Sequence, residues 1–326
     1  MIITRTPFRI SFVGGGSDLP AFYREYGGAV LSSTIDKYMY ISSHDFFEKE
    51  KIRTKYSATE TVNSVDDIKH PILRTIIKKL NVNLGLEISS IADVPAGTGM
   101  GSSSSFTVGT LHNMMAREGK INRVNKAWLG EKACEVEIND LNEPIGKQDQ
   151  YAAAFGGLNI FRFNRDDTVN VEPIHIDKDA LTQFSKHMRL YYIGNQRSAS
   201  SILSMQSKES LKEDKIESLK TMVSFVDDFA KSIISNNWKL CGDIIDENWS
   251  LKQSLADGIS NPGIKQIYSL GKKHGAWGAK LLGAGGGGFM LFFAPPEKHL
   301  SIDQALGLSN FPFKLESAGS QVIFNG

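Results

Sequence analysis

The order of apolar and polar residues along the chain predicts strands and helices in alternation. Apolar and polar positions alternate over 2–13, which is typical of a strand, and three glycines at 14–16 end the pattern. Further strands are expected at 27–36, 38–47, 52–56, 85–91, 158–163, 169–176 and 188–193, and a last pair within 311–324.

Apolar residues at three- and four-residue intervals predict the helices. These are expected at 71–80, 102–117, 123–138, 147–155, 210–236, 238–255 and 264–274. The breaker-rich sequence NDLNEPIG separates two of them and forces a change of direction. The composition shifts towards helix near 177–184, so we expect two domains, at 1–178 and 179–326.

The segment DVPAGTGMGSSSSFT at 93–107 contains the strongest chemical signal. Three glycines (Gly97, Gly99 and Gly101) precede four serines that open a helix. Glycines let a backbone fold closely around a ligand, and the free N–H groups of a helix start attract phosphate. The segment lacks the lysine of a Walker A loop and does not fit a dinucleotide GxGxxG pattern. The alternative is a Gly/Ser turn in which a serine caps the helix.

Two other glycine clusters also allow the backbone to lie close to a ligand. GGGSD at 14–18 follows a strand and ends in an acid, which can place the Asp18 carboxylate beside a ligand; alternatively, Ser17 or Asp18 caps the next helix. KLLGAGGGGFMLFF at 280–293 has consecutive glycines between apolar runs, so another backbone or a ligand can approach closely. The alternative there is a mobile hairpin.

Composition and charge exclude several classes of protein. The 326 residues include 37 Lys plus Arg and 36 Asp plus Glu, so no overall field favours nucleic acid or an acidic membrane, and any anion site must be local. No signal peptide or membrane span is apparent, so a cytoplasmic protein is expected. The two cysteines, Cys134 and Cys241, have no metal-binding spacing, and scattered histidines do not predict a structural zinc site.

Glu137, Asp149 and Ser103 complete a possible kinase site. Phosphoryl transfer needs a phosphate cradle, oxygen ligands for Mg²⁺, and a group that orients or deprotonates the attacking hydroxyl. Taken separately, Glu137 and Asp149 are more simply interpreted as solvated helix carboxylates. Together with the glycine loops, they favour phosphoryl transfer.

Three motifs in order resemble those of the GHMP kinases, the family of galactokinase, homoserine kinase, mevalonate kinase and phosphomevalonate kinase. They are RTPFRISFVGGGSD, PAGTGMGSSSS and KLLGAGGGGF, and the Asp149 segment lies between the last two. The resemblance implies a two-domain α+β fold. Its N-terminal domain would be like ribosomal protein S5 domain 2 and its C-terminal domain ferredoxin-like, with ATP and the acceptor between them.

The resemblance also implies roles for individual residues. Asp149 matches the catalytic aspartate, and Arg9 matches the basic residue that faces the transferring phosphate. Ser103 and Glu137 would hold Mg²⁺. The residues expected to bind ATP are Pro95, Gly97, Thr98, Gly99, Met100, Gly101, Ser102, Ser103 and Ser104.

For the acceptor, the resemblance favours the sugar-1-kinase branch. Asp18 corresponds to a sugar-contacting aspartate, but Gly15 and Gly16 stand where galactokinases have Glu and His, so galactose is not expected. GGGSDLPAFY and GKQDQYAAAFGG most resemble kinases of D-glycero-D-manno-heptose 7-phosphate, which implies formation of the 1,7-bisphosphate for nucleotide-activated heptose and bacterial surface polysaccharide. Acceptor contacts are expected from Gly14, Gly15, Gly16, Ser17, Asp18, Arg197, Gly285, Gly286 and Gly287.

A phosphorylated acceptor also requires a cationic clamp, for which Arg197, Lys37 and Lys280 are candidates. A monomer or homodimer is expected, without a nucleic-acid or membrane partner. Three alternatives stay open: a fucose kinase or other sugar-1-kinase, a non-catalytic sugar and nucleotide sensor on the same fold, and the decarboxylase branch, which phosphorylates a tertiary alcohol before losing CO₂.

Overall fold

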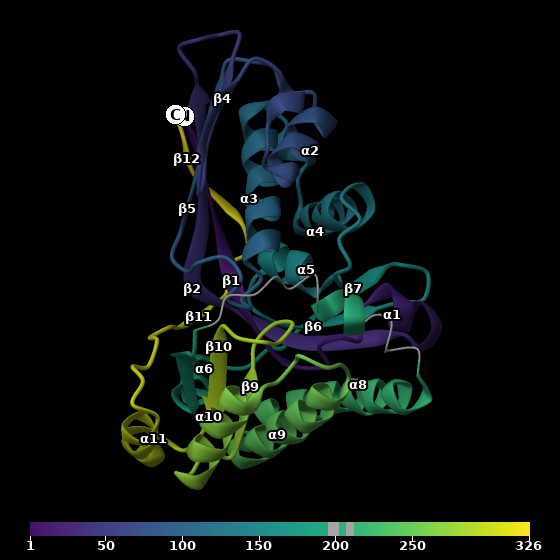
Figure 1. The fold of residues 1–326 in the computed structure, drawn as a ribbon, viewed down its shortest axis with the longest axis vertical. Coiled ribbons are helices and arrows are strands. Elements are labelled where there is room, and N and C mark those ends of the chain that lie inside the picture. Colours follow the sequence, from purple (N-terminus) through teal and green to yellow (C-terminus); the bar gives the residue numbers. More distant parts are fainter. Residues whose placement is uncertain (195–201, 207–211) are drawn as a thin grey trace.

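A computed structural model describes residues 1–194, 202–206 and 212–326. Two sheets and their helices form its layers (Figure 1). The larger sheet has the central order β12–β1–β2–β5–β3–β4, with β6, β7 and β11 attached beside β2. Its strands are β1 (Ile2–Val13), β2 (Gly28–Asp45), β3 (Ile52–Lys55), β4 (Thr59–Val62), β5 (Leu86–Ala92), β6 (Leu158–Phe163), β7 (Val169–Pro173), β11 (Leu315–Glu316) and β12 (Gln321–Asn325).

The helices of the N-terminal part pack together on one side of this sheet. Figure 1 shows them beside the strands of the larger sheet. They are α2 (Pro71–Lys79), α3 (Ser102–Arg117), α4 (Lys126–Cys134) and α5 (Gln148–Phe155). The short helix α1 (Pro20–Tyr26) lies apart from them and packs its buried Phe22 against residues of the C-terminal half. Apolar residues of α2 and α3 pack against the sheet, which explains the helical spacing of Leu73, Ile76 and Ile77.

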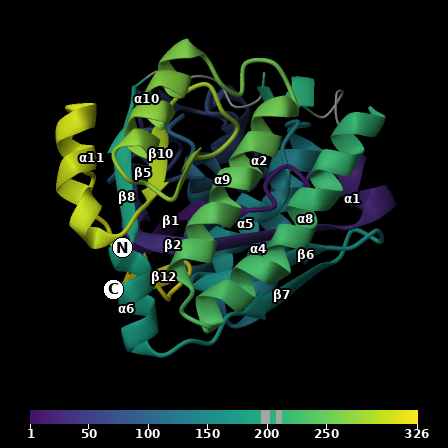
Figure 2. The ribbon, with the colours of Figure 1, turned by 90° about the horizontal axis from the view of Figure 1, so that it is seen from below.

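The smaller sheet has the order β8 (Met188–Tyr192), β10 (Phe289–Phe293) and β9 (Gly278–Leu281), all antiparallel. The surrounding helices are α6 (Lys178–Lys186), α8 (Glu213–Ile234), α9 (Trp238–Ser254), α10 (Pro262–Lys273) and α11 (His299–Leu306). Figure 2 shows α8 and α9 side by side. The second glycine cluster joins β9 to β10, so it is the turn of a hairpin.

Three of the expected elements take a different form in the structure, and β4, α6 and α11 were not expected. The segments 27–36 and 38–47 form the single strand β2, because Asp36 and Lys37 are accommodated in a bulge opposite Pro7 and Phe8. The helix expected at 123–138 begins at Lys126 and changes at Glu135 into a π-helical turn, Glu135–Asp140. Strands do form within 311–324, but β11 pairs with β2 and β12 with β1.

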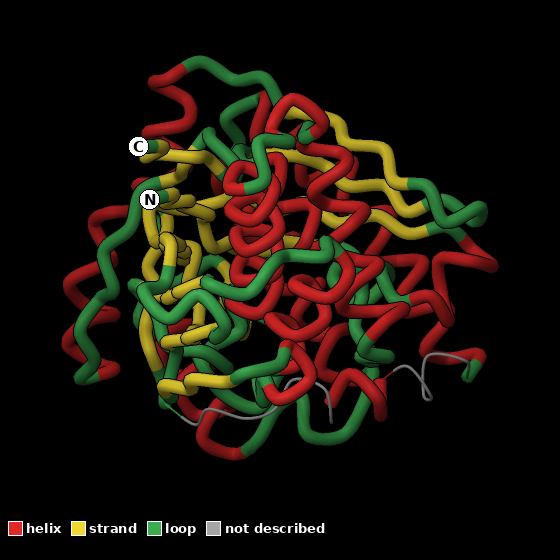
Figure 3. Tube along the Cα trace, turned by 90° about the horizontal axis from the view of Figure 1, so that it is seen from above, coloured by secondary structure: helices red, strands yellow, loops and turns green. Residues whose placement is uncertain are grey.

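Pairing of the chain ends connects the two halves of the sequence. Because β12 lies against β1, the two termini are neighbours (Figure 3). The C-terminal residues thus extend the larger sheet, although they follow the smaller one in sequence. The proposed domain boundary between 178 and 179 stays a prediction. The strands β11 and β12 come after it in sequence, but they belong to the larger sheet together with the N-terminal strands.

An aromatic cluster joins β1 to the helices of the C-terminal half. The Phe12 ring lies 5.3 Å from that of Phe184 on α6 and 5.5 Å from that of Phe229 on α8, and all three side chains are fully buried. Phe12 also lies two residues before the first glycine turn, which begins at Gly14. This cluster therefore fixes the strand end from which the turn begins.

We predict that Phe12→Ala lowers the free energy of unfolding by about 3–5 kcal/mol, because it removes a large buried ring and leaves a cavity. Urea denaturation followed by circular dichroism measures the change. Phe47→Ala is the matched control, since that ring is 93% exposed, and its effect should stay within about 0.5 kcal/mol. Equal midpoints for the two variants would contradict the assigned packing.

Candidate active site

The glycine loop before α3 is held in place by the second glycine cluster. Gly97, Gly99 and Gly101 all have left-handed backbone angles, with φ between 75° and 81°. A Cβ on Gly99 would overlap the carbonyl of Leu282, and one on Gly283 would come within 2.5 Å of the Gly99 Cα. A Cβ on Gly288 would overlap Thr98 in the same way. The two glycine segments therefore pack backbone to backbone, which no larger residue permits.

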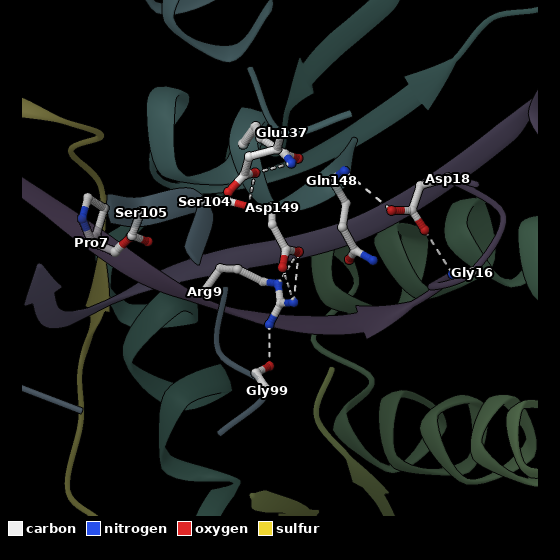
Figure 4. Close-up of polar contacts among 11 residues, drawn as sticks. Pro7, Arg9, Gly16, Asp18, Gly99, Ser104, Ser105, Glu137, Gln148 and Asp149 are labelled. Atoms are coloured by element: carbon white, nitrogen blue, oxygen red, sulfur yellow. Dashed lines mark hydrogen bonds and ion pairs between the residues drawn. The ribbon is translucent and has the colours of Figure 1, made fainter. Parts of the chain in front are cut away.

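An ion pair between Arg9 and Asp149 lies against this loop (Figure 4). Arg9 donates from Nε to Asp149 Oδ1 at 2.8 Å and from Nη2 to Oδ2 at 2.7 Å. Its Nη1 donates to the Gly99 carbonyl at 2.5 Å. The Arg9 side chain is 4% exposed and that of Asp149 is 24% exposed. The carboxylate is thus oriented through both oxygens while it stays accessible from the cavity.

Glu137 accepts hydrogen bonds from four side chains. Ser103 and Thr107 donate to Oε1 at 2.8 Å each, Ser104 donates to Oε2 at 2.8 Å, and Gln150 donates to Oε2 at 2.5 Å. Glu137 is 1% exposed. Burial raises the pKa of its carboxyl, and the four hydrogen bonds oppose that shift.

Asp18 is the third acidic group of the site and lies at the first glycine turn. Its carboxylate accepts from the Gly16 N–H at 2.9 Å and from the Gln148 N–H at 3.3 Å (Figure 4). A Cβ on Gly146 would overlap Asp18, so a glycine is required beneath it. Burial raises the pKa of Asp18, and the negative charge of Asp149 raises it further.

Arg9, Asp149 and Asp18 line one cavity of about 250 Å³, and Glu137 lies behind its wall. The glycine loop and α3 form one part of its wall, and the first glycine turn with α9 and β9 forms another. The predicted site residues that line it are Arg9, Gly15, Gly16, Asp18, Gly97, Gly99, Gly101, Ser102, Ser103, Ser104 and Asp149, and the candidate clamp Lys280 lines it as well. Most of the expected site is thus brought together.

Other predicted residues support the walls from behind. The Met100 carbonyl accepts from the Arg9 N–H at 3.1 Å, and Thr98 donates its hydroxyl proton to the Pro95 carbonyl at 2.9 Å. Ser17 donates to the Gly14 carbonyl at 2.8 Å and so fixes the first turn. Residues that do not line the cavity are Pro95, Thr98, Met100, Gly14, Ser17, Glu137, Gly285, Gly286, Gly287 and Lys37.

Gly285 and Gly286 contact the backbone of Ile259 instead of the cavity. Arg197, expected at the acceptor, lies outside the described residues.

Sequence reasoning missed Lys252 and Asn248, which reach the cavity from α9. Asn248 Oδ1 accepts from the Gly14 N–H at 3.1 Å. The sequence did contain a signal for them, namely the helical spacing of Cys241, Ile245, Asn248 and Lys252. All four are buried in the structure. A lysine within the apolar stripe of a helix indicates a function for that lysine.

The residues around Glu137 fit a magnesium ion delivered with a nucleotide. Carboxylate and hydroxyl oxygens are hard ligands, and Mg²⁺ in kinases takes its remaining ligands from phosphates and water. Ser103 is exposed at the cavity, whereas Glu137 lies directly behind it. In the described part of the chain no group of three or more His, Cys, Asp or Glu could hold a metal by itself.

A phosphotransferase needs three parts around one cavity: a phosphate-type loop, a buried carboxylate with hydroxyl partners and an oriented aspartate. The structure has all three. Comparison with known families supports this interpretation of the site. The model for the GHMP kinases N terminal domain matches residues 68–157, and that for GHMP kinases C terminal matches 229–305, together about half of the chain. The chain belongs to the GHMP kinase family, as its motifs predicted.

The chain is similar to sugar kinases within this family. It is 29% identical over 316 residues to D-glycero-alpha-D-manno-heptose 7-phosphate kinase of Campylobacter jejuni, covering 94% of this chain and 93% of that protein. It is 26% identical to the bifunctional fucokinase/GDP-fucose pyrophosphorylase of Arabidopsis thaliana, covering 88% of this chain and 29% of that protein.

Solved structures confirm the α+β fold. A D-glycero-D-manno-heptose 1-phosphate kinase from Bacteroides thetaiotaomicron superimposes with a TM-score of 0.81 at 22% identity, over 100% of both chains. Lactococcus lactis galactokinase complexed with galactose gives 0.78 at 14% identity, covering 98% of this chain and 94% of that one. No helix among the described residues is long and apolar enough to cross a membrane.

We predict that Gly99→Ala lowers kcat/KM on the order of 10²-fold, because the new Cβ overlaps Leu282 and displaces the loop from the cavity. Steady-state kinetics with varied ATP measures the change. Gly119→Ala is the control for backbone strain alone: its φ of +67° is also left-handed, but nothing lies within 4 Å of the added Cβ. Equal losses in both variants would show that contact between the glycine segments is unimportant.

Proposed function

We propose that this chain is an ATP-dependent kinase for the anomeric hydroxyl of D-glycero-D-manno-heptose 7-phosphate, with the 1,7-bisphosphate as product. This step would supply nucleotide-activated heptose for surface polysaccharide. The observation that carries the proposal is the Arg9–Asp149 pair, which lies in one cavity with the glycine loop and the Asp18 turn. The 29% identity to the Campylobacter jejuni kinase over nearly both whole chains supports the acceptor.

Asp149 is the group that orients the attacking hydroxyl and accepts its proton. Arg9 holds both carboxylate oxygens, so the aspartate has a fixed direction before the substrate arrives. The Arg9 guanidinium also places positive charge where negative charge increases during transfer. Because the transition state is loose, most of the rate enhancement comes from this positioning and charge neutralisation.

The glycine loop and the start of α3 bind the phosphates of ATP. Backbone N–H groups at Ser102 and the next residues have no partner within the helix, and Gly101 turns the chain so that they face the cavity. Ser103 and Glu137 would hold the Mg²⁺ that accompanies the nucleotide. That ion, when bound, neutralises phosphate charge during transfer.

The first glycine turn binds the acceptor. Gly15 and Gly16 carry no side chains into the cavity, which leaves room for a substrate larger than a hexose. Asp18 accepts hydrogen bonds from sugar hydroxyls on the side of the cavity next to Gln148. The fucokinase similarities support a second candidate, L-fucose, which would use the same Asp149 and Arg9.

An ADP-release assay over hexoses, heptoses and their phosphates tests the proposal. Heptose 7-phosphate should give ADP, and ³¹P NMR of the product should show a second phosphate on the anomeric carbon. ADP release with fucose but not with the heptose phosphate would favour the second candidate. Binding of sugar and nucleotide without ADP release from any acceptor would instead indicate a sensor.

We predict that Asp149→Asn lowers kcat about 10²–10⁴-fold and leaves ATP affinity unchanged, because the amide cannot accept the proton. Rapid-quench kinetics and nucleotide titration measure the two quantities. Asp228→Asn is a control carboxylate on α8 that pairs with Lys231 at the surface. A kcat near that of the wild type for Asp149→Asn would refute the assigned role.

We predict that Ser103→Ala and Glu137→Gln raise the Mg²⁺ concentration needed for half-maximal activity, because each removes an oxygen ligand or its charge. Titration with MgCl₂ at saturating ATP measures the shift. Thr107→Val is a useful comparison, since Thr107 also donates to Glu137 but is buried away from the cavity. An unchanged magnesium titration in both test variants would contradict the ligand role.

A further inference from the structure

Two lysines at the acceptor end of the cavity are buried, and their hydrogen bonds in the described structure go to uncharged groups. Lys252 is 7% exposed and Lys280 is 5% exposed, and both line the cavity. Lys252 Nζ donates to the Gln206 side-chain oxygen at 2.9 Å and to the Gly15 carbonyl at 3.3 Å. Lys280 Nζ donates to the Phe12 carbonyl at 2.8 Å. All three acceptors are uncharged.

Among the described residues, Asp18 is the carboxylate whose charge reaches Lys252, and no carboxylate contributes comparably at Lys280. Lys280 is instead destabilised by the charges of Lys252 and Arg9. Burial lowers the pKa of Lys252 to about 8, and burial with these cations lowers that of Lys280 well below its usual value. A buried ammonium without a paired anion is costly, so its retention needs a reason.

The position of Lys252 indicates what would complete the site. Its Nζ lies above the first glycine turn, where a Cβ on Gly16 would be 3.1 Å from it. The hydrogen bonds of both lysines go to residues 12–15 and 206, and in the described part of the chain none goes to the loop at 97–104. This is the acceptor side of the Arg9–Asp149 pair, away from the serines proposed to bind ATP.

We propose that Lys252, assisted by the neighbouring Lys280, binds the phosphate group of a phosphorylated sugar acceptor. The inference rests on the proposed function, because it assumes a kinase whose acceptor enters between the first glycine turn and α9. A phosphate dianion supplies acceptor oxygens and the missing negative charge together. The substrate class is then a sugar phosphate, and an unphosphorylated sugar would leave the Lys252 ammonium without an anionic partner.

The γ-phosphate of ATP is the other possible source of a phosphate at these lysines. The two sources are separated by filling the nucleotide site first. With Mg²⁺ and a non-hydrolysable ATP analogue at saturation, any further binding of inorganic phosphate reports on the acceptor end. Isothermal titration calorimetry measures this binding directly.

The variant Lys252→Met removes the charge and keeps the length of the side chain. We expect its affinity for inorganic phosphate to fall about 10- to 100-fold and its KM for the sugar phosphate to rise by a similar factor, as for a lost charged hydrogen bond. The KM for ATP should change less than about twofold. The unfolding midpoint without ligand should stay the same or rise, because an uncompensated buried charge is removed.

Lys239→Met is the matched control, since Lys239 lies on the same helix and pairs with Asp243 at the surface. It should behave like the wild type in every assay. If Lys252→Met fails to fold, Lys252→Gln keeps a donor towards the Gly15 carbonyl and provides the same comparison.

Equal phosphate affinity in wild type and Lys252 variants, or no phosphate binding by the analogue-saturated wild type, overturns the inference. A lower unfolding midpoint with a raised KM for both substrates also overturns it, because that result indicates a structural lysine. Failure of the proposed function looks different. In that case heptose 7-phosphate gives no ADP, although phosphate binding still depends on Lys252.

Discussion

The partly buried ion pair of Arg9 and Asp149 is the interaction on which the site depends. It connects β1, the glycine loop and α5, which are far apart in sequence, through hydrogen bonds to Asp149 and Gly99. A buried pair contributes little net stability, but loss of one partner leaves an uncompensated charge. The pair is therefore better explained by orientation: it fixes a carboxylate between the glycine loop, proposed to bind phosphate, and the first glycine turn, proposed to bind the acceptor.

Contact between glycine segments is the second constraint. The loop before α3 can approach the cavity because Gly99 packs on Leu282 and Gly283 without side chains between them. The hairpin of β9 and β10 thus determines where the phosphate loop lies. Since Lys280 is on β9 and lines the cavity, the same hairpin also places this lysine at the end of the cavity proposed to bind the acceptor.

Sequence patterns predicted the elements well where one local rule dominates. The helix Ser102–Arg117 and the strand Leu158–Phe163 have the predicted bounds. Gly101 precedes the helix and Gly119 follows it, whereas Gly157 precedes the strand and the polar turn at 164–168 ends it. The break expected at Asp36 and Lys37 was wrong, because a bulge keeps both residues within one strand.

At the site, too, the sequence did not show which distant residues come into contact. Motifs identified Arg9 and Asp149, but not that they form a pair. Lys252 was missed because its burial results from packing of α9 against a distant turn.

The stereochemical course of phosphoryl transfer tests whether Asp149 orients the acceptor hydroxyl for direct attack on the γ-phosphate within one cavity. ATP with an isotopically chiral γ-phosphate is used with the accepted sugar phosphate, and the configuration at phosphorus in the product is determined by ³¹P NMR. A single in-line transfer predicts inversion. Retention would show that a covalent phosphoenzyme forms first, and would contradict the account.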